Sequence, residues 1–341
     1  QLPTPAAKIS AKEPALPAAA RPASLDDLAF LPVAKLASLL RAQKVTSREL
    51  TELSLSRLKR FDGALSAVVT LTEERALRQA DAADAELRAG RWHGPLHGVP
   101  WGAKDLLAVR GYPTTWGAAQ FKDRRLDEEA EVVRRLDAAG AVLVAKLALG
   151  ALANGDGWFG GQTTCPWNLA TGSSGSSAGS CAAVSAGLVP FALGSETLGS
   201  IVSPATRNAV TGFRPSHGRV SRAGAMALAW SMDKIGPIAR PAEDCALVFA
   251  AVHGADPADP SAIDAPFTWS PAPDLRGQRI GILTGETDGP TPATLDTLRE
   301  IGAELVPLTL PKAPLQTLRL ILTVEAAAAF QSIRTITQTD V

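Results

Sequence analysis

The chain has 341 residues, of which 46% are apolar and 20% charged, the usual balance of a globular protein with a sizeable core. Lys and Arg together number 34, as do Asp and Glu, so the neutral chain offers no electrostatic footprint for nucleic acid or an anionic membrane. The three cysteines form no C-x-x-C pair, which argues against a disulfide framework or a zinc-finger site.

Residues 1–23 are rich in Pro and Ala and show no hydrophobic period, which predicts an extended leader or linker. The sequence begins with Gln1 rather than Met, as it would after removal of a signal peptide. We therefore expect a periplasmic or secreted location, while a cytoplasmic one stays open.

Residues 24–90 are predicted to be mostly helical. Ser24 resembles a capping residue, and Thr46 to Glu49 form a capping box before a segment with helical periodicity. Residues 67–72 form a short β-branched run typical of a strand, and residues 73–88 an Ala-rich charged helix that ends at Gly90.

From residue 99, short apolar runs alternate with helical segments, which predicts an α/β sheet covered by helices. The predicted strands are 99–107, 141–149, 190–193, 280–283 and 305–310. The predicted helices are 127–139, a segment ending near 188, 241–253, 292–301 and 317–330.

Residues 171–221 carry the chemistry. A Gly/Ser loop runs into a helix, a strand then ends in the turn from Gly194 to Ser200, and a Pro/Gly-rich return follows. A serine at the end of a tight glycine turn has backbone N–H groups beside it that stabilise an oxyanion. Such a serine is a weak nucleophile until a base takes its proton.

No histidine fits that role, and no G-x-S-x-G elbow is present. His93 and His97 have the spacing of metal ligands, but neither a carboxylate nor a cysteine in the sequence completes the set, so we predict no metal site. His217 and His253 are expected to have structural or exposed roles.

Lys104 is the alternative base, because burial among apolar residues would lower its pKa and keep the amine neutral. A structural lysine paired with Asp105 or another acid is the simpler interpretation of the spacing alone, so both stay open on the residues themselves.

Several motifs together resemble the amidase signature family. Gly175-Ser176-Ser177-Ala178-Gly179-Ser180 is followed by Ser200 in a Gly-Ser-Ile turn, and PLHGVPWGAKDLL (95–107) resembles the family's lysine strand. AGAVLVAKLALGAL, SMDKIGPIARPAEDCALV and GFRPSHGRVS match further family segments, over roughly residues 25–270. The resemblance implies a central mixed, mostly parallel twisted sheet with helices on both faces, in a single domain over residues 24–341 that lacks part of the usual C-terminal region.

The resemblance also implies the site residues. Ser200 is the nucleophile, Ser176, after a cis peptide bond, is the relay, and Lys104 is the base. The backbone N–H groups of three turn residues form the oxyanion hole, and two loop residues support the network. The oxyanion residues are Thr197, Leu198 and Gly199, and the supporting residues are Gly175 and Ser177. Lys146 matches a family position outside the triad.

Three departures from the family pattern stand out: Leu198 replaces a glycine, Val202 an arginine and Ala178 a glycine.

We expect a hydrolase that cleaves the carboxylic amide bond of a small-molecule substrate and needs no metal or organic cofactor. Esters and carbamates also stay open as substrates. The alternatives are an inactive family member and an ammonia-releasing component of a glutamine amidotransferase. We expect no direct contact with nucleic acid or membrane, and homo-oligomerisation stays open. Several tryptophans are candidates for lining the acyl site.

Overall fold

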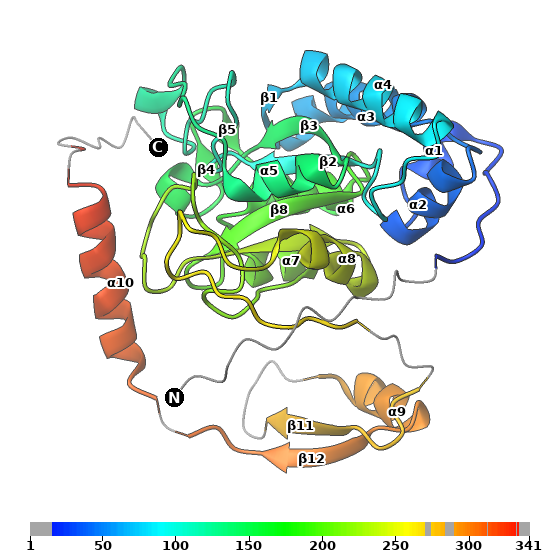
Figure 1. Ribbon diagram of the computed structural model, residues 1–341. Coiled ribbons are helices and arrows are strands. Elements are labelled where there is room, and N and C mark those ends of the chain that lie inside the picture. The colour runs from blue at the N-terminus through cyan, green and yellow to red at the C-terminus, as the bar shows by residue number, and fades with distance from the viewer. Residues whose placement is uncertain (1–15, 270–273, 284–289, 312, 332, 334–341) are drawn as a thin grey trace. The chain divides into compact units, whose positions relative to one another are not determined.

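The computed structural model describes residues 16–269, 274–283, 290–311, 313–331 and 333 (Figure 1). The chain divides into two compact units, residues 1–267 with 322–341, and residues 268–321. The single domain predicted over residues 24–341 stays a prediction, and most of the predicted leader lies outside the described residues.

The helices of the first unit lie mainly before and between the strands of its sheet. They are α1 (Leu25–Leu28), α2 (Val33–Arg41), α3 (Ser47–Leu65), α4 (Glu73–Arg88), α5 (Glu131–Ala138), α6 (Ala178–Ser185), α7 (Val202–Arg207) and α8 (Ala242–Val252), with short 3-10 turns η1 (Ala119–Phe121) and η2 (Ala151–Ala153). The strands are β1 (Val68–Leu71), β2 (Pro100–Lys104), β3 (Val142–Leu147), β8 (Phe191–Glu196), β9 (Thr211–Gly212), β10 (Lys234–Ala239) and the short pieces β4 (Gly157–Trp158), β5 (Gly161–Gln162), β6 (Thr164–Cys165) and β7 (Asn168–Gly172).

The central sheet has six strands in the order β1-β3-β2-β8-β10-β9. Its middle pairs, β3 with β2 and β2 with β8, are parallel, and the three outer pairs are antiparallel. The mixed sheet is therefore confirmed, but the prediction that it is mostly parallel is wrong. Parallel neighbours need long crossover connections, and here the connection through α5 joins β2 to β3, while the chain returns through α6 to β8 on the other side of β2.

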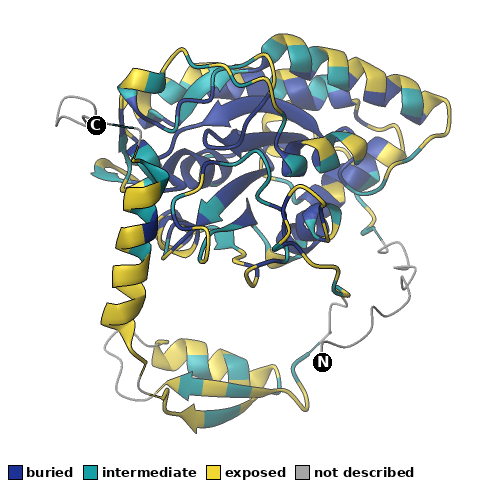
Figure 2. Cartoon of the chain, turned by 60° about the vertical axis from the view of Figure 1, so that its left-hand side comes forward, coloured by how far each residue is buried: buried dark blue, intermediate teal, exposed yellow. Residues whose placement is uncertain are grey.

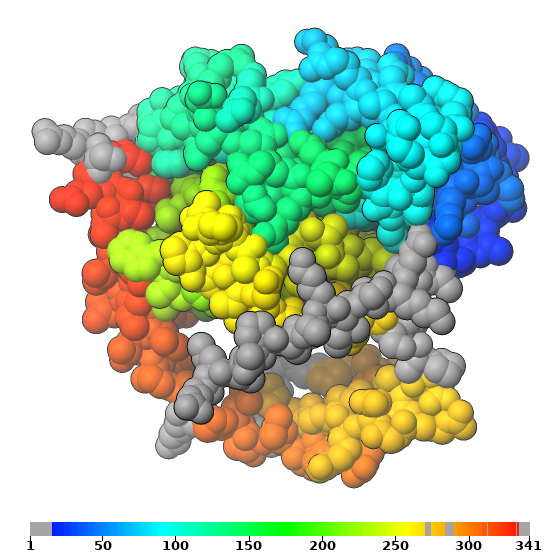
Figure 3. Space-filling model, in the orientation of Figure 1, coloured from blue at the N-terminus to red at the C-terminus, as the bar shows by residue number. Residues whose placement is uncertain are grey.

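Two apolar cores lie on opposite faces of this sheet, because neighbouring strand residues point to opposite sides. Leu143 belongs to the cluster with Val133, Leu136 and Val248 of α5 and α8, whereas Val144 belongs to the cluster on the other face. The second cluster is completed by apolar residues of α3, α4 and α6. Figure 2 shows most strands of the central sheet in the colour of buried residues, and Figure 3 shows the outer surface that surrounds them.

Most predicted elements are confirmed within about four residues. The capping box at Thr46 is complete, and α4 has the predicted limits. The prediction omitted β10, because Gly236 and Pro237 at its centre are typical of a turn. A Cβ at Gly236 would lie 2.1 Å from the Phe213 carbonyl oxygen, so this strand needs glycine where the neighbouring chain approaches.

The second unit contains a parallel pair, β11 (Arg279–Leu283) with β12 (Glu304–Leu308), and α9 (Pro292–Glu300). The last helix, α10 (Leu315–Ala329), begins in this unit and continues into residues assigned to the first. Among the described residues, no helix combines the length and apolar character required to span a membrane.

Candidate active site

The predicted site residues come from three neighbouring positions in the sheet. Lys104 ends β2, and Ser200 follows β8, which runs parallel to β2. Ser176 and Ser177 immediately precede α6, whose first turn begins at residue 178. Because the carboxyl ends of parallel strands meet at one edge of a sheet, this topology gathers the three segments at that edge.

Lys104 is fully buried and its amine contacts three serines. Its Nζ lies at hydrogen-bond distance from all three hydroxyl groups, 2.8 Å from Ser176 Oγ, 2.9 Å from Ser177 Oγ and 3.0 Å from Ser195 Oγ. Among the described residues, no carboxylate forms an ion pair with this amine. Hydroxyl groups are therefore its immediate partners.

The alternative in which Lys104 pairs with Asp105 is not what the structure shows. The Asp105 carboxylate contacts the amine of Lys146, with both side chains fully buried, and also accepts the Thr115 backbone N–H at 2.9 Å. Asp105 lies in the turn just after β2, and its side chain is directed to Lys146 of β3. Lys146 thus satisfies the acid, and Lys104 faces the serines.

Burial lowers the pKa of Lys104 to about 7, because the charged amine loses its hydration. Cys181, Asp233 and Glu196 oppose this shift by favouring the charged form, but their effect is smaller. An amine with this pKa is substantially neutral at physiological pH, so it has a free lone pair that can accept a proton.

The loop before α6 holds the two serines in place. The Gly175–Ser176 peptide bond is cis, as the family resemblance implied. Ser177 Oγ donates to the Ser195 carbonyl at 3.1 Å, so this side chain links the loop to β8. A Cβ at Gly175 would lie 1.7 Å from the Gly155 carbonyl oxygen, which leaves space for glycine alone.

Ser200 lies beside this loop, because its carbonyl accepts the Ser177 N–H at 3.1 Å. Ser200 is 8% exposed, and its hydroxyl has no hydrogen-bond partner among the described residues. The Ser176–Ser200 link of the predicted relay is thus not formed as a hydrogen bond here. Catalytic hydrogen bonds are commonly long before substrate binds.

The turn before Ser200 tolerates Leu198 for a simple reason. Gly199 has a φ of +91°, whereas Leu198 is not among the residues with positive φ. The turn therefore requires glycine at one position only, and the Leu198 side chain is exposed to solvent.

Glu196 is a further residue of this site, which was not among the predicted site residues. Its buried carboxylate accepts the backbone N–H groups of Ile201 at 2.8 Å and Val202 at 2.9 Å, and Arg214 pairs with it at 3.1 Å. Burial acts to raise the pKa of Glu196, but these groups and the Gly199 N–H outweigh it, so the pKa is lower than usual. An acid at the end of a buried strand, four residues before the serine, was the available signal.

A cavity of about 220 Å³ lies next to this edge. Its lining includes Ser195, Thr197, Trp230, Met226 and Leu228. Of the predicted tryptophan candidates, only Trp230 lines the cavity together with these site residues, whereas Trp101 stacks against Phe191 in the buried sheet.

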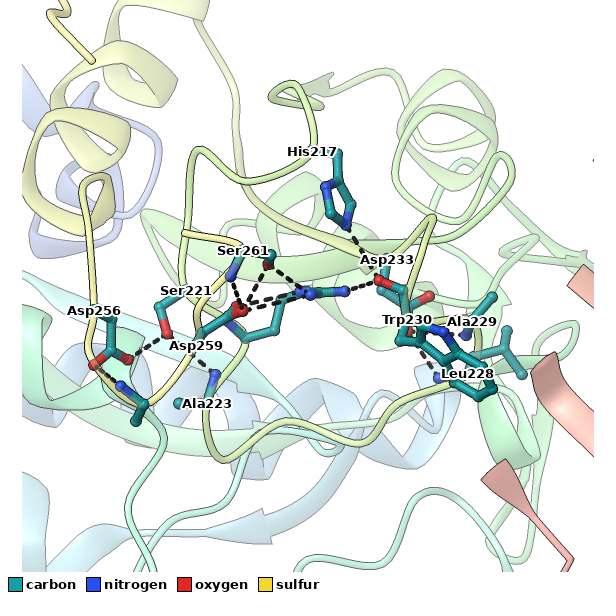
Figure 4. Close-up of polar contacts among 12 residues, drawn as sticks. His217, Ser221, Ala223, Leu228, Ala229, Trp230, Asp233, Asp256, Asp259 and Ser261 are labelled. Carbon is teal, nitrogen blue, oxygen red and sulfur yellow. Dashed lines mark hydrogen bonds and ion pairs between the residues drawn. The ribbon is translucent and has the colours of Figure 1, made fainter. Parts of the chain in front are cut away.

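Two carboxylates accept hydrogen bonds from the polar residues that line the cavity (Figure 4). Asp233 accepts the Thr197 hydroxyl at 2.5 Å and the backbone N–H groups of Leu228 and Ala229 at 2.8 and 3.0 Å. Asp259 accepts the Arg222 N–H at 2.8 Å. The lining therefore combines an apolar surface with charged groups that already have partners.

A comparison with protein families matches residues 49–340 to the family Amidase. The site defines a class of α/β proteins with a buried lysine that contacts serines at the edge of a mixed sheet. The chain belongs to the amidase signature family.

The proteins that this chain resembles include both amidotransferase components and amidases. The chain is 41% identical over 298 residues to the A component of the Halorhodospira halophila glutamyl-tRNA(Gln) amidotransferase, a match that covers 83% of this chain and 61% of the relative. Native peptide amidase from Stenotrophomonas maltophilia superposes with a TM-score of 0.81 at 36% identity, over 91% of this chain and 69% of that one. The corresponding amidotransferase component of Thermotoga maritima gives 0.75 at 27% identity, over 92% and 68%. The chain thus spans about three fifths of the length of the curated relatives it matches.

Proposed function

We propose that this protein hydrolyses carboxylic amides through an acyl-enzyme on Ser200, with Ser176 as relay and Lys104 as base. The observation that carries the proposal is the buried Lys104 amine, 2.8 Å from the Ser176 hydroxyl and with a pKa of about 7. A neutral lysine held against a serine hydroxyl is suited to remove a proton.

In the proposed acylation step, Lys104 takes the Ser176 proton while Ser176 takes the proton of Ser200. The Ser200 oxygen attacks the amide carbon, and the tetrahedral intermediate collapses with cleavage of the C–N bond. The leaving amine receives its proton back through Ser176. Water then attacks the ester by the same route, releases the carboxylic acid and restores the Ser200 hydroxyl.

The oxyanion would be stabilised by the backbone N–H groups of Thr197, Leu198 and Gly199, and the Gly199 N–H would be shared with the Glu196 carboxylate that it also contacts. Glu196 supports this assignment, since its carboxylate binds the N–H groups that follow Ser200 and thereby fixes the turn. Ser177 and Gly175 serve as positioning residues in this scheme, because the first binds the Lys104 amine and the second leaves room for Gly155.

The direct test is Ser200→Ala on amide, anilide, ester and carbamate substrates. We expect a loss of about 10³-fold or more in turnover, since the covalent route is removed. Ser216→Ala, at an exposed serine, is the matched control and should keep full activity. A fluorophosphonate probe should label the wild type and the control but not Ser200→Ala; near-normal turnover of that variant would refute the nucleophile assignment.

A second candidate is the ammonia-releasing component of an amidotransferase, which acts on a glutamine side chain. It is favoured by the curated relatives, which are named as amidotransferase components at 38–42% identity. Release of ammonia from glutamine only after addition of partner proteins would favour this candidate. Hydrolysis of the amide panel by the isolated chain would favour the stand-alone amidase.

A further inference from the structure

Three potential metal ligands meet at a position that shares no residue with the proposed active site. Glu86 belongs to the last turns of α4, while His93 and His97 lie in the turn before β2. The two histidines alone predicted no metal site, because no carboxylate was assigned to them from the sequence. The fold supplies Glu86, and ligand atoms of all three residues lie within 4.8 Å of one another.

The spacing of these atoms matches a metal site. Glu86 Oε2 lies 3.0 Å from His93 Nε2 and 3.3 Å from His97 Nε2. Bonds of 2.0–2.1 Å in tetrahedral geometry place neighbouring ligand atoms about 3.3 Å apart. The His93–Glu86 contact is a hydrogen bond that coordination would replace, and both distances are within about 0.3 Å of that spacing.

His97 provides an independent indication of a ligand. Its side chain is fully buried, and its Nε2 has no hydrogen-bond partner among the described residues, although it faces the Glu86 carboxylate. Buried polar atoms normally have a partner. The ring position is fixed by packing, because a Cβ at Gly140 would lie 2.7 Å from the His97 Cδ2 atom.

The proton on His97 must move for Nε2 to bind a metal. At present Nδ1 accepts the His93 backbone N–H at 3.2 Å. Coordination through Nε2 places the ring proton on Nδ1, which breaks this long hydrogen bond. The cost is one long hydrogen bond, which is small against the free energy of zinc binding.

We propose that Glu86, His93 and His97 bind one divalent transition metal ion, with zinc as the preferred ion. Two imidazoles and one carboxylate are ligands that suit Zn²⁺, and the fourth position is left for water. The ion ties the end of α4 to the turn that leads into β2, the strand that ends at Lys104.

The test is a zinc titration of the full-length, tag-free chain after removal of metal by a chelator, followed by isothermal calorimetry. We expect one Zn²⁺ per chain, and an increase of the Tm by about 5 °C at a free zinc concentration of 100 times the Kd. His93→Gln and Glu86→Gln, both at partly exposed side chains, should weaken binding at least about 30-fold.

His217→Gln is the matched control, because His217 is exposed and lies outside the cluster. It should bind zinc as the wild type does. Co²⁺ in place of zinc should give the visible absorption bands of a four-coordinate site in wild type and control, and lose them in the two ligand variants. Absence of stoichiometric binding in the wild type, or unchanged binding in both ligand variants, would overturn the proposal.

Discussion

At the scale of single residues, the buried amine of Lys104 determines the expected pH dependence of activity. Its pKa is about 7, and only the neutral form can accept the Ser176 proton. We expect kcat/KM to rise about 100-fold from pH 5 to pH 8 and then to level off, since the neutral fraction falls tenfold per pH unit below the pKa. Initial rates with an uncharged anilide measure this profile. A rate that stays flat across this range would remove Lys104 as the base.

Glu196 gives a second prediction at this scale. In Glu196→Gln, the remaining carbonyl oxygen can still accept the Ile201 and Val202 N–H groups, so kcat should fall by about tenfold or less. Glu196→Ala leaves those groups without an acceptor and frees the turn, so kcat should fall about 10²-fold with little change in KM. Steady-state kinetics separate the two constants. Equal losses in both variants would show that the acceptor atom does not position the turn.

At the scale of elements, the buried Asp105–Lys146 pair joins β2 to β3 and to the loop at Thr115. Asp105→Asn leaves the lysine buried without its counter-ion, and we expect a loss of about 3–5 kcal/mol in the free energy of unfolding. The double variant Asp105→Leu with Lys146→Met should recover much of this loss. Urea unfolding provides the measurement.

The exposed pair Arg48–Asp81 serves as the control for this prediction. Asp81→Asn should change the free energy of unfolding by less than about 1 kcal/mol, because solvent screens exposed charges. A buried variant that costs no more than this one would show that the Asp105 pair contributes little to joining the strands.

The elements that sequence patterns predicted well are those with a clear local signal. Thr46 and Glu49 define the start of α3, and the β-branched run predicts β1. The pattern failed at β10, where Gly236 is required by a neighbouring carbonyl that is distant in sequence. Glu86 lies only seven residues before His93, but nothing in the spacing indicates that the end of α4 places its carboxylate beside both histidines.

At the scale of the whole molecule, the site residues were predicted through a family likeness, because serine and lysine spacing alone left the partner of Lys104 open. The folded structure decides it, because Lys104 at the end of β2 contacts the serines, whereas Asp105 in the turn that follows contacts Lys146. The cavity wall could not be predicted, since Asp233 and Asp259 reach it through loops without a regular period.

Contacts between distant parts of the chain also set how stability depends on pH. The buried Asp244 of α8 accepts the Val33 and Ala34 N–H groups at the start of α2, at 2.8 and 3.3 Å. Burial raises the pKa of Asp244 to about 6 from 3.8, against the effect of these N–H groups and Arg240. Between those pH values the folded chain holds a proton that the unfolded chain has released, so the contribution of this group to stability is lost as pH rises through 6.

Asp244→Asn should remove this dependence. Relative to the variant, the wild type should lose about 2–3 kcal/mol of unfolding free energy between pH 4 and pH 7, at about 1.4 kcal/mol per pKa unit. Urea unfolding of both proteins at unit pH intervals measures the difference, in which the other titrating groups cancel. The variant also loses an acceptor for one N–H group, which lowers its stability by a constant amount at every pH. Parallel curves for the two proteins would mean that Asp244 ionises in the folded chain as it does in the unfolded one, and that the joint between α2 and α8 holds a charged carboxylate throughout.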